Sequence, residues 1–133
     1  MGLYSKLNQE LVEEFGRLEQ LCNQIYGENH GVTSYIDDMD NLSASARYKV
    51  DNWDYYHKGL KEVRHKRNKL SHGEVSFSEN YAEPEDIEFI SDFYTLIMNS
   101  TDPISRYRKS TRSASPAPKK SSYNTTSDFG EYR

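Results

Sequence analysis

The sequence predicts an all-α protein: a small bundle of four to five helices followed by a disordered C-terminal tail. Over the first hundred positions, apolar residues recur at intervals of three and four, the period of a helix that buries one face. No convincing run of alternating apolar and polar residues indicates a strand. A chain of 133 residues has room for a single core. We therefore expect one bundle over residues 1–102 and a tail over residues 103–133.

The first predicted helix lies near the N-terminus and ends at Gly27, because glycine readily adopts the left-handed conformation that closes many helices. Its apolar stripe comprises Leu3, Leu7, Leu11, Phe15, Leu18, Cys22 and Ile25. A shorter second helix is predicted from the spacing of Val32, Tyr35, Ile36, Met39 and Leu42.

The third predicted helix covers residues 46–72 and ends at Gly73. Its apolar and aromatic positions are Val50, Trp53, Tyr56, Leu60, Val63 and Leu70. Residues 74–83 are expected to form a polar loop. A fourth helix is predicted from Pro84, which suits the first helical turn, to about Ser100, shortly before Pro103.

The composition changes from Ser105 onward, where Ser, Thr, Pro and basic residues dominate. Such a segment cannot bury a core, and this predicts disorder. One interpretation is a solubilising end without further function. The other is a basic arm that adds sequence-independent affinity for phosphates.

Composition excludes several functional classes. A net charge of −4 argues against a general nucleic-acid coat. No apolar run approaches the roughly 20 residues of a membrane span, and the N-terminus lacks the apolar core of a secretory signal. The single cysteine, Cys22, excludes an intramolecular disulfide, and the spacing of His57, His65 and His72 is too wide for one metal ion. We expect a cytoplasmic protein with no membrane partner, no metal and no cofactor.

Arg67 occupies an unusual position on the third predicted helix. The apolar stripe through Leu60 and Val63 places it at a core-facing step. A buried arginine without a partner costs several kcal/mol. Arg67 is therefore expected either to pair with a carboxylate of the first helix (Glu13, Glu14 or Glu19) or to border a cleft that holds an anion.

Further polar residues surround Arg67 in the sequence. Asn68 and His72 are four residues apart and share a helix face. A cation, an amide and a group that carries a proton near neutral pH together make a phosphodiester-cleaving site chemically plausible. We name Arg67, Asn68 and His72 as candidate catalytic residues. The candidate substrate-binding residues are Arg64, Lys66, Lys69 and Ser71.

The segment from Arg67 to Gly73, RNKLSHG, matches the R-N-x-x-x-H motif of the HEPN (higher-eukaryote and prokaryote nucleotide-binding) domain. The wider stretch VRHKRNKLSHG also resembles a sequence pattern common in that family. The resemblance implies a metal-independent endoribonuclease that acts at a dimer cleft and leaves a cyclic phosphate, or a non-catalytic relative that binds nucleic acid. It further implies that Arg67 stabilises the charge of the phosphorane, that His72 moves the proton and that Asn68 orients the phosphate or the histidine.

One position departs from the toxin branch of that family, which pairs with a nucleotidyltransferase. The branch usually has a tyrosine two residues after the histidine, and this chain has Glu74. The departure argues against regulation by tyrosine adenylylation.

The sequence therefore predicts an HEPN-type ribonuclease in a toxin–antitoxin or phage-defence setting. Its expected partners are RNA, a second copy of the chain and a regulatory protein. A homodimer is expected because cleavage needs both a base and an acid, whereas one chain offers one His72. The alternative is a non-catalytic HEPN-like module that binds RNA or protein. A third reading is a plain structural bundle whose basic face is solvated.

Overall fold

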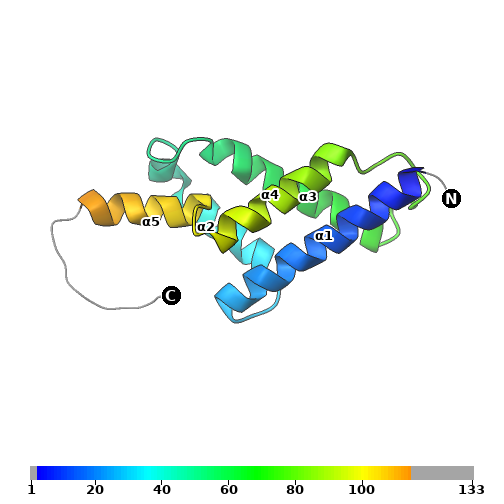
Figure 1. The fold of residues 1–133 in the computed structure, drawn as a ribbon, viewed down its shortest axis with the longest axis horizontal. Coiled ribbons are helices and arrows are strands. Elements are labelled where there is room, and N and C mark those ends of the chain that lie inside the picture. The colour runs from blue at the N-terminus through cyan, green and yellow to red at the C-terminus, as the bar shows by residue number, and fades with distance from the viewer. Residues whose placement is uncertain (1–2, 115–133) are drawn as a thin grey trace.

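The computed structural model describes residues 3–114, and these form five helices without a strand (Figure 1). The helices are α1 (Leu3–Tyr26), α2 (Gly31–Ala46), α3 (Trp53–Ser71), α4 (Pro84–Met98) and α5 (Pro103–Ala114). The predicted all-α class and helical bundle are confirmed. The rest of the predicted tail, residues 115–133, lies outside the described residues. No helix in the described range is long and apolar enough to cross a membrane.

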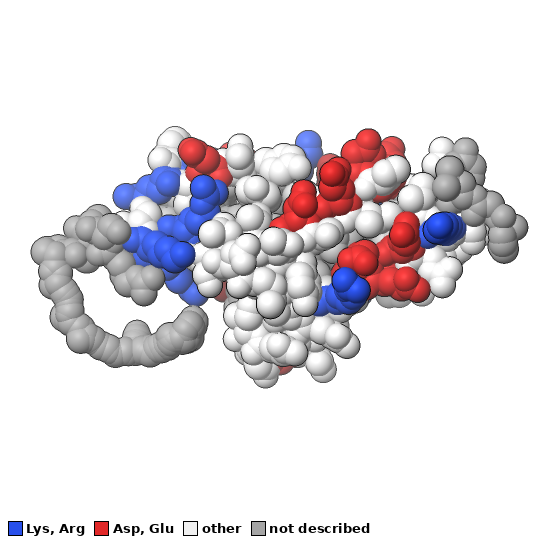
Figure 2. Space-filling view, in the orientation of Figure 1, with Lys and Arg blue, Asp and Glu red and all other residues white. Residues whose placement is uncertain are grey.

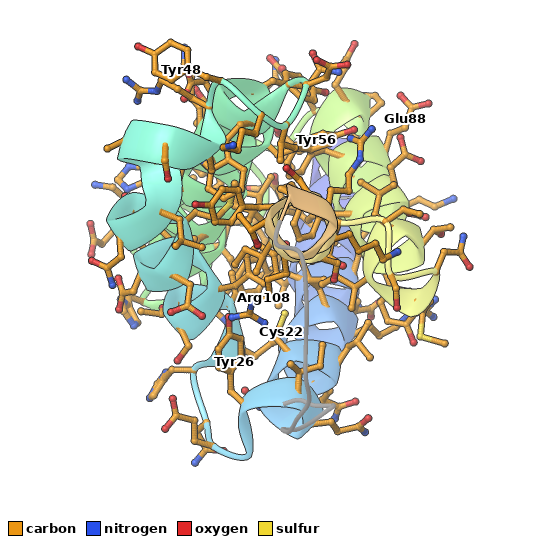
Figure 3. The ribbon with its side chains drawn as sticks, turned by 90° about the vertical axis from the view of Figure 1, so that its left-hand side faces the viewer. Cys22, Tyr26, Tyr48, Tyr56, Glu88 and Arg108 are labelled. Atoms are coloured by element: carbon orange, nitrogen blue, oxygen red, sulfur yellow. The ribbon has the colours of Figure 1, made fainter. Side chains whose placement is uncertain are left out.

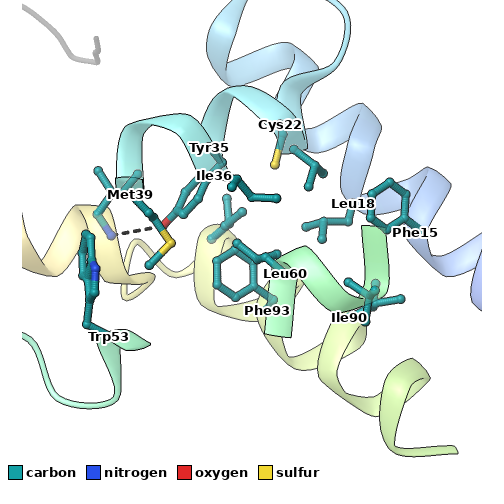
Figure 4. Close-up of a cluster of buried hydrophobic side chains, with 14 of the residues drawn as sticks. Phe15, Leu18, Cys22, Tyr35, Ile36, Met39, Trp53, Leu60, Ile90 and Phe93 are labelled. Atoms are coloured by element: carbon teal, nitrogen blue, oxygen red, sulfur yellow. Dashed lines mark hydrogen bonds between the residues drawn. The ribbon is translucent and has the colours of Figure 1, made fainter. Parts of the chain in front are cut away.

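The core lies where α1, α2, α3 and α4 meet (Figure 4). Its labelled side chains are Phe15, Leu18, Cys22, Tyr35, Ile36, Met39, Trp53, Leu60, Ile90 and Phe93, all of them buried. Each large apolar side chain that leaves water stabilises the fold by about 1.5–3 kcal/mol. The predicted stripe of α1 is confirmed at Leu11, Phe15, Leu18 and Cys22, but Ile25 is 51% exposed. Burial raises the pKa of the Cys22 thiol, as suits a small core residue.

The predicted third helix is too long at its N-terminal end. Residues 47–52 form a turn, because the N–H groups of Lys49 and Val50 both donate to the carbonyl oxygen of Ala46 (2.9 Å each). Asn52 then adopts the left-handed conformation (φ 64°), which asparagine tolerates better than most residues. Trp53 follows as the first residue of α3, and Val50 is buried inside the turn rather than on a helix.

The loop between α3 and α4 is polar, as predicted, and a single side chain of α1 holds it. Asn8 is fully buried, and its Nδ2 group donates to the carbonyl oxygens of Phe77 and Glu79 (2.7 Å each). Its Oδ1 atom accepts a hydrogen bond from the N–H of Ala82 (2.7 Å). The loop therefore returns to α1 directly before Pro84 begins α4, also as predicted.

We expect Asn8→Ala to lower the free energy of unfolding by about 2 kcal/mol. The carbonyl oxygens of Phe77 and Glu79 belong to exposed residues and can rehydrate, whereas the buried N–H of Ala82 would be left without a partner. Urea unfolding measures the loss. Asn41→Ala, which removes an exposed asparagine of α2, is the matched control. Equal stability of the two variants would contradict this role of Asn8.

Helix α5 corrects the predicted boundary at residue 103. Asp102 is buried and caps α5 by accepting hydrogen bonds from the N–H (3.3 Å) and the hydroxyl (2.7 Å) of Ser105. Tyr35 of α2 donates its hydroxyl proton to Asp102 and accepts a hydrogen bond from the N–H of Ile104 (3.0 Å). Burial, and then the Asp102 carboxylate, raise the pKa of Tyr35, which therefore keeps this proton.

The expectation of disorder failed for residues 103–114 because it used average composition. Ile104 is 3% exposed, and the ring of Tyr107 packs edge-on against Trp53, with 6.3 Å between the ring centroids. Two apolar side chains three residues apart, together with the buried cap, are enough to dock a short helix on an existing bundle.

Candidate functional site

The candidate site lies on the last two turns of α3. Arg67 is half-buried, and its guanidinium carbon lies 4.3 Å from the centroid of the Phe15 ring of α1. This is a cation–π contact. The Nε group of Arg67 donates a hydrogen bond to Oδ1 of Asn68 (3.0 Å). The structure thus brings two of the three predicted catalytic residues into direct contact.

None of the three glutamates proposed as partners pairs with Arg67. Glu13 accepts a hydrogen bond from Gln9 (3.4 Å), and Glu14 lies 3.9 Å from Arg17. Within residues 5–111, whose side chains are described, Arg67 has no ion pair. Partial burial lowers the pKa of Arg67, an effect that the Glu19 carboxylate opposes and the neighbouring Arg64 reinforces. Arg67 is therefore a cation that Phe15 and Asn68 hold in place and that has no carboxylate partner among the described side chains.

The two lysines that flank this pair are already neutralised. The Nζ atom of Lys66 lies 2.7 Å from Oδ2 of Asp86, so it connects α3 to the first turn of α4. The Nζ atom of Lys69 lies 3.0 Å from Oε1 of Glu74, just beyond the end of α3. The hydrogen bond between Lys69 and Glu74 raises the pKa of Lys69 and lowers that of Glu74. Both lysines were predicted to bind substrate, and in this structure both contact carboxylates instead.

The other two candidate substrate-binding residues have different surroundings. Arg64 donates a hydrogen bond from Nη1 to Oγ1 of Thr33 in α2 (3.2 Å). Ser71 is the last residue of α3 and is exposed. Arg64 therefore helps to join α3 to α2, and Ser71 remains accessible.

His72 caps the C-terminus of α3 and is exposed. Its N–H donates to the carbonyl oxygen of Asn68 (2.9 Å), which places it one turn beyond Asn68. Gly73 follows with a positive φ of 74°, as predicted for the residue that ends this helix. No hydrogen bond joins the His72 side chain to another side chain in the described part of the protein, so its imidazole is open to solvent.

A second histidine has a partner that sequence reasoning missed. His57 is half-buried, and its Nε2 atom lies 2.6 Å from Oδ1 of Asp40 in α2. The two atoms are close, but Nε2 of His57 is buried and makes no hydrogen bond of acceptable geometry with any described residue. No sequence signal links the two residues, because they belong to different helices. Among the described residues, no group of histidine, cysteine and acidic side chains is arranged to hold a metal ion.

The shallow hollow between α3 and α4 has an acidic rim. Tyr55, Gly59 and Phe89 form its apolar part, and Glu62, Glu85 and Asp86 border it. Of the aromatic residues in the first turn of α3, Trp53 is buried, Tyr56 is half-buried and Tyr55 is exposed. A carboxylate rim repels phosphates, so this hollow does not suit a nucleic-acid backbone.

No curated protein and no solved structure matches the chain. A family model does match it over residues 9–132, from within α1 through α5 and beyond the described residues. The match includes all of the candidate site on α3. The chain therefore belongs to a family of unknown function, DUF6548.

Proposed function

We propose that this protein is an HEPN-type, metal-independent endoribonuclease that acts in the cytoplasm at a cleft formed by two copies of the chain. One observation carries the proposal: Arg67 is held by Phe15 and Asn68 without a carboxylate partner in the described range, whereas Lys66 and Lys69 each have one. A guanidinium with fixed orientation and free N–H groups suits a phosphate, which it can contact through two parallel hydrogen bonds.

The proposed reaction is a transesterification within RNA. The ribose 2′-oxygen attacks phosphorus and loses its proton, and the bond to the 5′-oxygen breaks as that oxygen gains a proton. The products are a 2′,3′-cyclic phosphate and a 5′-hydroxyl. Arg67 stabilises the negative charge of the phosphorane, and Asn68 orients Arg67 toward the phosphate. The two His72 side chains of a dimer serve as base and acid.

A non-catalytic HEPN-like module that binds RNA or protein is the second candidate. Two contacts favour this candidate: Arg67 stacks on Phe15, and Arg67 is hydrogen-bonded to Asn68. Both contribute to the packing of α3 on α1 without any ligand. The setting in toxin–antitoxin or phage defence, with a regulatory protein partner, is supported only by the resemblance of the motif.

We expect the purified protein to cleave mixed RNA in the presence of EDTA and to leave 2′,3′-cyclic phosphate ends. His72→Ala should slow cleavage by about 10²–10⁴-fold, the usual contribution of a group that transfers a proton. His65→Ala, which removes an exposed histidine of the same helix, is the matched control and should cleave normally. Cleavage that requires added magnesium, or equal rates for both variants, would contradict the mechanism. RNA binding without cleavage would favour the second candidate.

A further inference from the structure

The end of the molecule at which α5 docks carries exposed basic side chains from two segments. Arg47 and Lys49 lie in the turn between α2 and α3, and Arg106 and Lys109 lie on α5. We call these four residues the basic end. Figure 2 shows Lys and Arg gathered on this side together with a smaller acidic group, and the turn itself carries the exposed Asp51; most Asp and Glu in this view lie over α1 and α4. The net charge of −4 thus conceals a strong separation of charge along the molecule.

Contacts between the two segments keep the basic end together. The hydroxyl of Tyr107 on α5 lies 2.8 Å from Oγ of Ser45, next to the turn, and its ring packs against Trp53 on the other side of the turn. The remaining basic residue of α5 with a described side chain, Arg108, lies beside Tyr26 and away from the turn (Figure 3). We therefore do not include Arg108 in the surface.

The charge of the basic end is mostly uncompensated. Lys49, Arg106 and Lys109 have no ion pair with any described carboxylate. Arg47 lies 3.5 Å from Asp54, but both side chains are largely exposed, and such pairs are weak. The Nζ group of Lys109 donates a hydrogen bond to the carbonyl oxygen of Ser100 (2.8 Å). Exposed cations without a carboxylate partner among the described residues form a surface that attracts phosphates.

An exposed aromatic ring stands between two of these cations. Tyr48 is 83% exposed, and Figure 3 shows it projecting from the bundle. It contributes almost nothing to the core, and its sequence neighbours Arg47 and Lys49 are both basic and exposed. A ring flanked by cations is the arrangement with which proteins stack a base while holding the adjoining phosphates.

We propose that the basic end binds single-stranded RNA without regard to its sequence, with Tyr48 stacked on a base and the four cations on neighbouring phosphates. The choice of RNA rests on the proposed function, to which this surface adds a substrate contact separate from Arg67. A single-stranded nucleic acid fits better than a lipid surface, because Tyr48 projects alone among polar residues of the turn.

The first test measures stacking. The probe is a fluorescein-labelled 20-mer of 2′-O-methyluridine, which cannot be cleaved because its 2′-oxygen is blocked. Tyr48→Ala should weaken binding of this probe by roughly 5- to 150-fold in fluorescence anisotropy, the range measured for loss of one stacked base. Tyr55→Ala removes a 62%-exposed tyrosine beside the acidic hollow and should bind like the wild type. Equal binding by Tyr48→Ala and the wild type would overturn the proposal.

The second test measures the charges. Lys49→Gln should weaken binding and reduce the slope of log K against log salt concentration by about 0.7, the contribution of one phosphate contact on a single strand. Lys6→Gln makes the same change in charge near the start of α1, at the opposite end of the molecule (Figure 1), and should keep the slope. Equal slopes for both variants would mean that only net charge matters and would contradict the proposal that the basic end binds RNA.

A third set of measurements distinguishes RNA from a lipid membrane as the ligand of the basic end. It also distinguishes RNA binding at this surface from RNA cleavage. If Tyr48→Ala and Lys49→Gln lose binding only to phosphatidylserine vesicles and not to the probe, the proposal fails in favour of a lipid surface. If the probe binds through Tyr48 but unmodified RNA is never cleaved, the proposed ribonuclease activity fails and this surface stands. If unmodified RNA is cleaved while both variants bind the probe normally, only the surface fails.

Discussion

Arg67→Leu protein is expected to lose RNA cleavage by about 10²–10³-fold while it remains folded. The loss follows from removal of the cation that stabilises charge on the phosphorane. The fold should persist because leucine can still pack on Phe15 and avoids the burial of a charge without a carboxylate partner in the described range. Cleavage rate and thermal melting together measure both parts. Arg17→Leu, a change at an exposed arginine of α1, should leave the rate unchanged.

Mixing two inactive variants tests whether the proposed site spans two chains. Arg67→Leu protein and His72→Ala protein should recover part of the lost activity when mixed, provided that one cleft takes its arginine from one chain and its histidine from the other. Activity of the wild type should also fall on dilution below the dissociation constant of the dimer. A large loss of melting temperature in Arg67→Leu would instead make Arg67 a structural residue. Full activity in a strictly monomeric species would exclude the shared cleft.

Gly31→Ala is expected to destabilise the protein by about 3 kcal/mol or more, the upper end of the cost of overpacking. Gly31 begins α2 where it crosses the end of α1, and an added Cβ atom would overlap backbone atoms of Cys22 and Asn23. Neither backbone can move freely, because the N–H of Gly31 is hydrogen-bonded to Oδ1 of Asn23 (2.7 Å).

Gly16→Ala is the matched control for this prediction. A Cβ atom at Gly16, inside α1, would meet no atom within 4 Å. Alanine at an open position in a helix stabilises the fold by about 0.5–1 kcal/mol relative to glycine. The two alanine variants should therefore shift the urea midpoint in opposite directions. A wild-type midpoint for Gly31→Ala would show that α1 and α2 separate easily at this crossing.

Local sequence rules were sufficient wherever a structural feature depends on residues a few positions apart. The apolar stripe of α1, the glycine that follows His72 and the proline that begins α4 were all predicted. Each depends on helix period or on the backbone preference of one residue, and neighbouring residues determine both. The same local reasoning placed Arg67, Asn68 and His72 at the end of one helix.

Tertiary structure decided every feature that joins distant segments. Average composition predicted disorder from residue 103, but the Tyr35–Asp102 hydrogen bond and the buried Ile104 dock α5 on the bundle. The sequence prediction also missed the turn that ends at Asn52. Val50, which is buried in this turn, has the spacing of the helical stripe as well. Sequence period alone cannot separate these two cases.

The charged residues of the candidate site also combine features that the local sequence predicts with features that only the tertiary structure decides. From the sequence, Lys66, Arg67 and Lys69 are equivalent cations on one helix. The fold places Asp86 beside Lys66 and Glu74 beside Lys69, whereas among the described side chains Arg67 contacts the ring of Phe15 and the amide of Asn68 and no carboxylate. Glu74 and Asn68 are near neighbours in the sequence, but Asp86 of α4 and Phe15 of α1 reach Lys66 and Arg67 only when the helices pack.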